Sequence, residues 1–291
     1  MSIVDTRLDQ VFFFALPIEA RPLEARLERN PSVGPDESGP DKSEPDESEP
    51  EGAAESLSTD RILNVLKTRF SNRKIQWGLL NGKTTAIVRT GAGKENARKA
   101  ARAFLRQTIP SIVWSVGFAG ALDETIKKQQ ILTDLIPLLR PQSSLVDILP
   151  EKVLIYEPDP NGAPLRPTGT ANGPAPRFII TTDRIIARSE EKAELFRTTG
   201  AAVVDMETDA IAQVCEEFGV PLKCVRIISD AASDELPPDL ERLMEQKSFM
   251  GQMGAAIGSL WKKPGRIVDL FALKANALES AEKLAAYLAE Q

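Results

Sequence analysis

The sequence predicts an α/β fold with three layers, in which helices cover both faces of a central mixed sheet (αβα). Apolar segments with the character of strands alternate along the chain with segments that have helical spacing, which is typical of a sheet covered on both sides. The 291 residues are enough to bury a substantial core, and 42% hydrophobic with 27% charged residues is the composition of a globular protein.

Turn and cap signals delimit the elements of the first half of the chain. Pro17 ends the first apolar run, and Ser58 or Thr59 is suited to cap the second helix. The dipeptide Asn81-Gly82 lies between two apolar runs and is the strongest short signal for a hairpin. We expect strands over 11–16, 75–80, 84–89 and 111–116, and helices over 19–28, 57–70 and 93–107.

The second half continues the alternation and then becomes helical. Residues 157–177 are rich in Pro, Gly and Asn and are expected to form a loop. We expect strands over 131–136, 153–156, 178–181, 201–205 and 221–229. Helices are expected over 189–196, 207–218, 238–246, 249–262 and 266–289.

An acidic segment interrupts the fold. Residues 34–53 are a five-residue near-repeat with prolines in phase, and their eight acids and one lysine carry −7 of the chain's net −6. With no large apolar side chain to bury, the segment is predicted to be a disordered solvated loop, or a docking segment for a basic partner. The domain boundaries follow: a domain over 8–265, an insert over 31–56 and a C-terminal helix over 266–291.

Composition excludes several classes of protein. The mild acidity argues against nucleic-acid binding, and no apolar run is long enough to span a membrane. The charged start does not resemble a signal peptide, so we expect a cytoplasmic protein. Cys215 and Cys224 are expected to be reduced, buried thiols. The absence of histidine excludes His-based catalysis and His-ligated metals, so acid–base chemistry falls to carboxylates, Lys, Tyr or Cys.

Unusual residues follow five of the predicted strands. Ligands of open α/β sheets bind beyond the carboxyl ends of the strands, so these residues are candidates for chemistry. Three ends carry a carboxylate, namely Glu19, Glu207 and Asp230, and two carry turns of small residues over 90–96 and 117–121. Three carboxylates suit a reaction that needs an acid, a base that activates water and a group that binds hydroxyls.

Each of these residues also has an ordinary structural interpretation. TGAGK resembles a phosphate loop, but Glu95 follows Lys94 where that motif needs Ser or Thr, so a plain helix-opening turn is equally compatible. Glu207 can simply favour a helix N-terminus, and Asp230 can cap the next segment. Glu19 can be an ordinary acid in the first turn of a helix.

Four motifs stand at these strand ends: ALPIEA, RTGAGKENA, SVGFAGALD and VVDMETDAIAQVCEEFGVPLKCVRIISDAASD. Together they resemble the nucleoside phosphorylase/nucleosidase superfamily, and within it the methylthioadenosine/S-adenosylhomocysteine nucleosidases. The last motif is the most specific, because it combines a Met-Glu pair, a helix, a strand and I-S-D. The resemblance spans about 10–262, interrupted by the acidic insert and by residues 140–177, and it implies a phosphorylase/hydrolase-like fold.

The resemblance implies a role for each matched residue. Asp230 would protonate the purine at N7, with Ser229 orienting its carboxyl group, and Glu19 would activate the attacking water. Glu207 would hold the ribose hydroxyls more strongly as the sugar becomes cationic, and Met206 would pack on the sugar. The other implied substrate contacts are Gly91, Phe118, Ala119, Gly120 and Ile186.

The implied function is hydrolysis of the N-glycosidic bond of a 5′-substituted adenosine, with release of adenine. Where those nucleosidases stack an aromatic residue on adenine, this chain has Ile185 or Ile186, so an apolar wall would replace the aromatic ring. A small-molecule nucleoside is the expected partner, and a homodimer is implied by the resemblance alone. No metal or organic cofactor is expected.

Two other functions remain open. EARPL, DELPP and the tail WKKPGRIVDLFALKANALESAEKLAAYL resemble hopanoid-associated phosphorylase-like proteins, which implies a phosphorylase or nucleosidase acting on an adenosyl-lipid. The apolar stripe of the final helix, from Ile267 to Leu284, could cover a lipid-side pocket or a subunit interface, or simply pack on the fold. A non-catalytic nucleoside-binding protein is the third reading, which the three carboxylates disfavour.

Water is the predicted nucleophile rather than phosphate. A phosphorylase must neutralise a dianion, usually with arginine, and related phosphorylases commonly place Arg where this chain has Ser115. Arg21 and Arg89 are possible substitutes, although Arg21 is expected to point away from Glu19 on its helix.

Deleting residues 34–53 should leave the melting temperature and the turnover rate nearly unchanged, because a proline-phased segment without large apolar side chains has little to bury. Thermal denaturation and a purine-release assay on the deleted and the complete chain check this. A large fall in the melting temperature would show that the segment docks on the fold.

Overall fold

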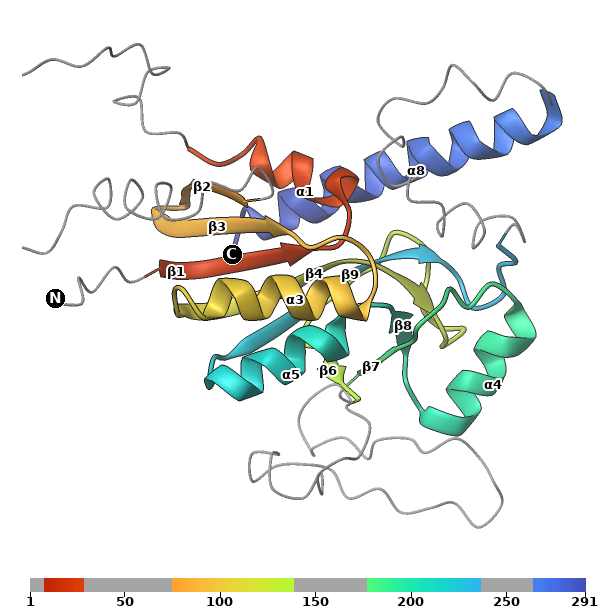
Figure 1. Ribbon diagram of the computed structural model, residues 1–291. Helices are drawn as coiled ribbons and strands as arrows, with labels where there is room; N and C mark the ends of the chain where they lie inside the picture. The colour runs from red at the N-terminus through yellow and green to blue at the C-terminus, as the bar shows by residue number, and fades with distance from the viewer. Residues whose placement is uncertain (1–7, 29–74, 139–176, 237–263) are drawn as a thin grey trace, which may run out of the picture.

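The computed structural model describes residues 8–28, 75–138, 177–236 and 264–291, and for 264–274 it describes the backbone alone. Its strands form one sheet between two helical layers (Figure 1), which confirms the predicted three-layer α/β fold. The strands are β1 (Leu8–Phe14), β2 (Ile75–Leu80), β3 (Lys83–Arg89), β4 (Pro110–Ala121), β5 (Ile131–Leu132), β6 (Ile136–Pro137), β7 (Phe178–Thr181), β8 (Val203–Asp205) and β9 (Leu222–Asp230). The helices are α1 (Pro17–Glu24), α3 (Lys94–Leu105), α4 (Ser189–Thr199), α5 (Thr208–Phe218) and α8 (Pro264–Leu288).

The sheet is mixed, as predicted. Its order is β2-β3-β1-β4-β8-β7-β6, and β9 pairs with β4 and with β5. Strands β3, β1, β4 and β9 are mutually parallel, whereas β2 and β8 run antiparallel to their neighbours β3 and β4. Because parallel strands end at one edge of a sheet, the residues that follow β1, β3, β4 and β9 are brought together there.

The central strand β4 pairs with three other strands, β1, β8 and β9. Residues from Val113 to Gly120 pair with β9, and Gly120 and Ala121 also pair with Val204 and Val203 of β8. The pairing with β9 shifts register between Ala119 and Gly120, so one residue of β9 bulges out beside the strand end.

Alternating phenylalanines in β1 face the two helical layers. Phe13 packs with Phe104 of α3 and Ile211 of α5, whereas Phe12 and Phe14 pack on the side of α1 and α8. This two-residue alternation is the reason why both faces of the strand are buried, and Figure 1 shows the helix pairs α3–α5 and α1–α8 on opposite faces.

The predicted hairpin is present. Asn81 and Gly82 have φ values of 53° and 73°, which suit a tight two-residue turn between β2 and β3. The turn also contacts the end of the chain: Asn81 Nδ2 donates to the Ala289 carbonyl at 2.6 Å, and Lys83 Nζ donates to Gln291 O at 2.7 Å.

One predicted strand is wrong. In place of a single strand over 131–136, the structure has two two-residue strands, β5 and β6, which pair with different partners. Asp134 lies between them with φ 54°, a left-handed conformation that interrupts an extended chain. Six predicted features lie outside the described residues: the acidic insert, the 157–177 loop apart from Arg177, the strand over 153–156 and the helices over 57–70, 238–246 and 249–262.

Two other predictions concern the cysteines and membrane-spanning helices. Cys215 and Cys224 are free and buried, as expected, and burial raises the pKa of each thiol to about 12. No helix in the described parts of the chain is long and apolar enough to cross a membrane.

The apolar stripe of α8 packs inward where its side chains are described. Ala281 and Leu284 are fully buried against the layer formed with α1. Leu284→Ala should therefore lower the free energy of unfolding by about 2–5 kcal/mol, through lost burial and an unfilled cavity. Chemical denaturation measures this.

Leu278→Ala in the same helix is the matched control, because Leu278 is 45% exposed. It should change the free energy of unfolding by less than about 0.5 kcal/mol. Equal losses from the two substitutions would contradict the placement of α8 on the sheet.

Candidate active site

A small cavity at the carboxyl ends of β1, β3 and β4 brings two of the three predicted carboxylates together. Glu19 and Glu207 both line this cavity, although they lie far apart in the sequence. The lining includes Glu19, Thr90, Ser115, Phe118, Glu207 and Arg226.

Glu19 lies in the first turn of α1 and is 3% exposed. Its Oε2 accepts a hydrogen bond from the Leu16 N–H at 2.8 Å, and its Oε1 accepts one from the Phe118 N–H at 2.9 Å. The first bond caps the helix, as an ordinary first-turn acid does, and the second ties α1 to β4. Burial raises the pKa of Glu19 to about 7 in spite of these donors.

A glycine in β4 makes room for this carboxyl group. A Cβ atom added at Gly117 would lie 2.9 Å from Glu19 Oε1, closer than Cβ atoms approach in practice. The small residues of the third motif therefore accommodate a side chain of the protein itself at this position.

Glu207 immediately precedes α5 and is partly buried. Its Oε1 accepts a hydrogen bond from the Gly93 N–H at 2.6 Å, where Gly93 has φ 90° at the start of α3. Burial, followed by the negative charge of Asp205, raises the pKa of Glu207 to about 8. The Gly-rich turn thus donates to a carboxylate of the chain, while Lys94 pairs with Asp183 at 3.0 Å.

Arg226 is a site residue that the sequence analysis did not identify. It is 2% exposed in β9, and its guanidinium contacts Asp205 Oδ2 at 2.7 Å, Ser115 Oγ at 2.8 Å and the Ser115 carbonyl at 2.6 Å. It also donates to Thr208 Oγ1. The available signal is an arginine flanked by apolar residues within the strand predicted over 221–229, because a charge in an apolar strand needs a partner if it is buried.

Asp205 is that partner. Its Oδ2 also accepts from the Thr208 N–H at 3.0 Å, and its Oδ1 accepts from Thr181 Oγ1 at 2.7 Å. The pair therefore fixes the start of α5, directly after Glu207, relative to β9 and β7.

Asp230 occupies a different environment. It is the last residue of β9 and does not belong to the residues that line the cavity with Glu19. Its Oδ2 pairs with Lys192 Nζ at 2.6 Å, and its Oδ1 accepts from Ser229 Oγ at 2.6 Å. A Cβ atom added at Gly120 would lie 2.9 Å from Asp230 Oδ2, so this carboxyl group also packs against a glycine of β4.

The other predicted contacts are distributed around the strand ends. Phe118 lines the cavity, whereas Ala119 is buried in a core cluster and Met206 is partly buried. Gly91 has φ 89° in the turn after β3. Ile186 is 7% exposed in an apolar cluster with Leu122, Phe178 and Val204, so as placed its side chain contributes to the core.

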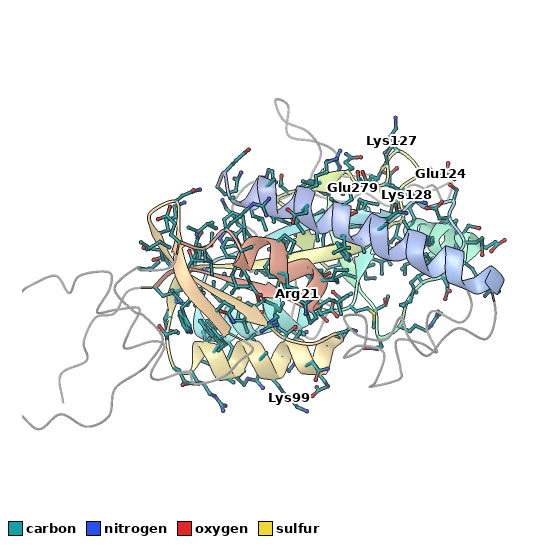
Figure 2. The ribbon with its side chains drawn as sticks, turned by 90° about the horizontal axis from the view of Figure 1, so that it is seen from above. Arg21, Lys99, Glu124, Lys127, Lys128 and Glu279 are labelled. Carbon is teal, nitrogen blue, oxygen red and sulfur yellow. The ribbon has the colours of Figure 1, made fainter. Side chains whose placement is uncertain are left out.

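The two arginines considered for phosphate are engaged or remote. Arg89 Nε lies 3.2 Å from Glu24 Oε1, and Arg21 is exposed on α1 (Figure 2). Within the described ranges, no group of three or more Cys, Asp or Glu side chains has an arrangement that could hold a metal ion.

Comparison with known proteins agrees with this architecture. The family model described as "Phosphorylase superfamily" matches residues 175–260. A 5′-methylthioadenosine/S-adenosylhomocysteine nucleosidase of Staphylococcus epidermidis is 28% identical over 188 residues, which cover 60% of this chain and 81% of the relative. The chain is thus similar to members of the phosphorylase superfamily, and it is an enzyme.

The chain is also similar in fold to two solved proteins from Helicobacter pylori. One is a mutant 5′-methylthioadenosine/S-adenosylhomocysteine nucleosidase with 5′-methylthioadenosine in its active site, which has a TM-score of 0.52 and 17% identity over 98% of this chain and 99% of that one. The other is futalosine hydrolase, with a TM-score of 0.52 and 16% identity over 97% of this chain and 95% of that one. At these identities the likeness concerns the fold.

The raised pKa of Glu19 predicts a pH-dependent effect on stability. Between about pH 4.5 and 7 the folded protein retains a proton that the unfolded chain has lost, so stability falls as pH rises through this window. A rise from 4.5 to about 7 corresponds to about 3 kcal/mol at and above pH 7. The Glu19→Gln variant lacks this titration, so its melting temperature should gain on that of the wild type from pH 4.5 to 7.

Glu207→Gln is the control for this measurement. Its difference from the wild type should continue to grow to about pH 8, since the pKa of Glu207 is about 8. A difference between the wild type and Glu19→Gln that does not change with pH would contradict the buried, uncompensated placement of Glu19.

Proposed function

We propose that the protein is a nucleosidase that hydrolyses the N-glycosidic bond of a 5′-substituted adenosine and releases adenine. The observation that carries the proposal is the meeting of the buried Glu19 and the partly buried Glu207 with the buried guanidinium of Arg226 around one cavity. The name of the Staphylococcus epidermidis relative supports the same reaction and substrate class.

Glu19 is the proposed base that activates water. A base works best when its pKa lies near the operating pH, and the pKa of Glu19 is about 7. Ser115 and Arg226 line the same cavity and can help to orient a water molecule beside Glu19. The water oxygen bonds to the anomeric carbon while Glu19 takes its proton.

Glu207 is the proposed partner of the ribose hydroxyl groups. One of its oxygens accepts from Gly93, which leaves the other available to accept from a hydroxyl of the sugar. As the C–N bond breaks, the sugar becomes cationic, and an ionised Glu207 stabilises that charge more than it stabilises the substrate.

Asp230 is the proposed acid at the purine, with Ser229 orienting it. This role rests on the resemblance of the I-S-D motif, and the 2.6 Å hydrogen bond from Ser229 Oγ to Asp230 Oδ1 supports the orienting part. Proton transfer to the purine makes it a neutral leaving group, which is what general acid catalysis contributes to N-glycoside cleavage.

Water is the proposed nucleophile because no uncommitted guanidinium lines the described cavity. Arg226 is bound to Asp205, Ser115 and Thr208, and two carboxyl groups nearby would repel a phosphate dianion. A homodimer stays a further prediction.

An adenosyl-lipid substrate remains the second candidate, since the tail of the chain resembles hopanoid-associated proteins. The buried side chains of Ala281 and Leu284 favour packing on the fold over a lipid-side pocket for that part of α8. The 5′ substituent is therefore left to the assay.

Product analysis tests the proposal. The protein is incubated with methylthioadenosine, S-adenosylhomocysteine, inosine and an adenosyl-lipid, with and without phosphate. We expect adenine and a free 5′-substituted ribose to form at the same rate in both conditions. Strict dependence on phosphate, with a ribose 1-phosphate as product, would show a phosphorylase, and no release from any nucleoside would favour a binding protein.

Two variants assign the roles. Asp230→Asn and Glu19→Gln should each lower the turnover rate by about 10²–10⁴-fold if acid and base catalysis act as proposed. Circular dichroism confirms that the variants fold. Turnover near that of the wild type in folded Asp230→Asn would remove Asp230 from the mechanism.

A further inference from the structure

A buried lysine holds the carboxyl group that the proposed mechanism uses as an acid. Lys192 lies in α4 and is fully buried, with 0% of its side chain exposed. Its Nζ donates to Asp230 Oδ2 at 2.6 Å, to the Ala231 carbonyl at 2.9 Å and to the Asp234 carbonyl at 3.0 Å. All three donor positions of the ammonium group are therefore used.

The three acceptors lie in one short segment at the end of β9. Because they belong to residues 230–234, a single ammonium group fixes the backbone of this segment and the carboxyl group at its start. Asp234 Oδ2 also accepts from the Ala231 N–H at 2.7 Å, which closes the turn on itself. Burying an ammonium group costs free energy unless the group is paired, and here the three acceptors at the end of β9 offset that cost.

We propose that Lys192 is a positioning residue for protonation of the purine: it fixes Asp230 and supplies the proton that Asp230 delivers. This inference rests on the nucleosidase function proposed above. The motif resemblance does not include Lys192, and the described cavity and the hydrolytic step do not otherwise use it.

The contact implies where the proton resides. The hydrogen bond from Lys192 Nζ to Asp230 Oδ2 at 2.6 Å places a proton of the ammonium group between the two side chains. The pair as a unit does carry a transferable proton, on Lys192 Nζ. Ser229 Oγ completes the arrangement by donating to the other oxygen of Asp230.

The proton transfers balance. As the C–N bond breaks and its electron pair moves to the purine, Nζ passes a proton to Asp230 Oδ2, and the carboxyl group turns its O–H to the purine nitrogen. The attacking water loses a proton to Glu19. Lys192 is left as a neutral amine, and the cycle closes when it regains a proton from solvent and Glu19 releases one.

Other charges around the pair are already matched in the described structure. Lys128 pairs with Asp234 Oδ2 at 2.8 Å, and Glu235 accepts hydrogen bonds from the backbone and hydroxyl of Ser189. Arg188 is exposed and carries the remaining nearby charge. Lys192 is thus the ammonium group in direct contact with Asp230.

The pH profile of the wild type is the first test. Activity should rise as Glu19 and Glu207 ionise, with pKa values of about 7 and about 8, and it should show no fall once both are ionised. In water an ammonium group of lysine gives up its proton near about pH 10, and a carboxylic acid near about pH 4. A rate that falls from pH 8 to 9 would overturn the inference.

Two substitutions separate charge from proton supply. Lys192→Arg keeps a positive charge but cannot release a proton below about pH 12, and Lys192→Met removes the charge. We expect both to lower kcat by about 10²-fold with little change in KM, and Lys192→Met to move the alkaline limit down by at least about one pH unit. The double variant Lys192→Met/Asp230→Asn should be no slower than Asp230→Asn.

Lys128→Met is the matched control, because it removes the neighbouring surface ammonium (Figure 2) without touching Asp230. Its kcat and pH profile should match the wild type. If folded Lys192 variants keep the wild-type kcat and pH limit, Lys192 is merely structural and the inference fails alone. If the wild type releases no purine, the proposed function fails and the inference with it.

Discussion

The buried ion pair between Arg226 and Asp205 is the constraint on which the rest of the site depends. A guanidinium without access to water needs an acceptor for each of its polar hydrogens, and here the acceptors come from β4, β8 and α5. Satisfying one charge in the interior therefore fixes the end of β8 and the start of α5 relative to the middle of β4. Glu207 stands between Asp205 and Thr208, two of those acceptors, so its position is set by the same network.

The pair also decides the electrostatic character of the cavity. Since Asp205 already offsets much of the positive charge of Arg226, little of that charge is left to favour ionised Glu19 and Glu207. Burial is the main reason why both carboxyl groups hold protons to higher pH than glutamates in water do, and the charge of Arg226 lowers their pKa values only in part. The same burial that makes these groups costly to ionise places them in the range where proton exchange with a substrate is effective.

Local sequence patterns predicted what depends on local physics. The Asn81-Gly82 turn, the strand Phe178–Thr181 and the carboxylates at strand ends follow from turn chemistry, periodicity and the general geometry of α/β sheets. Asp134 broke a predicted strand because one left-handed residue is enough to do so, and nothing in a short apolar run reveals that conformation.

Arg226 and Lys192 were missed for a different reason. Their partners are 21 and 38 positions away, or 111 in the case of Ser115, so only the folded topology reveals the pairing. Ile186 lies in an apolar cluster, and its predicted contact with the substrate stays a prediction. A charged residue inside an apolar strand, or on the buried side of a helix, indicates a buried ion pair or hydrogen-bond partner elsewhere in the chain.

The two glycines of β4 have a consequence for the spacing of the chemistry. Glu19 packs over Gly117 and Asp230 over Gly120, so both carboxyl groups are referenced to one continuous strand. Three residues of extended backbone span about 10 Å, and covalent geometry fixes this length far more tightly than side-chain rotamers could. Gly117 and Gly120 are the two positions of β4 at which the lack of a side chain makes room for these carboxyl groups. Inserting or deleting one residue between Gly117 and Gly120 would turn one of these two positions to the other face of the sheet, so a side chain would then press on Glu19 or Asp230 even if every functional side chain were retained.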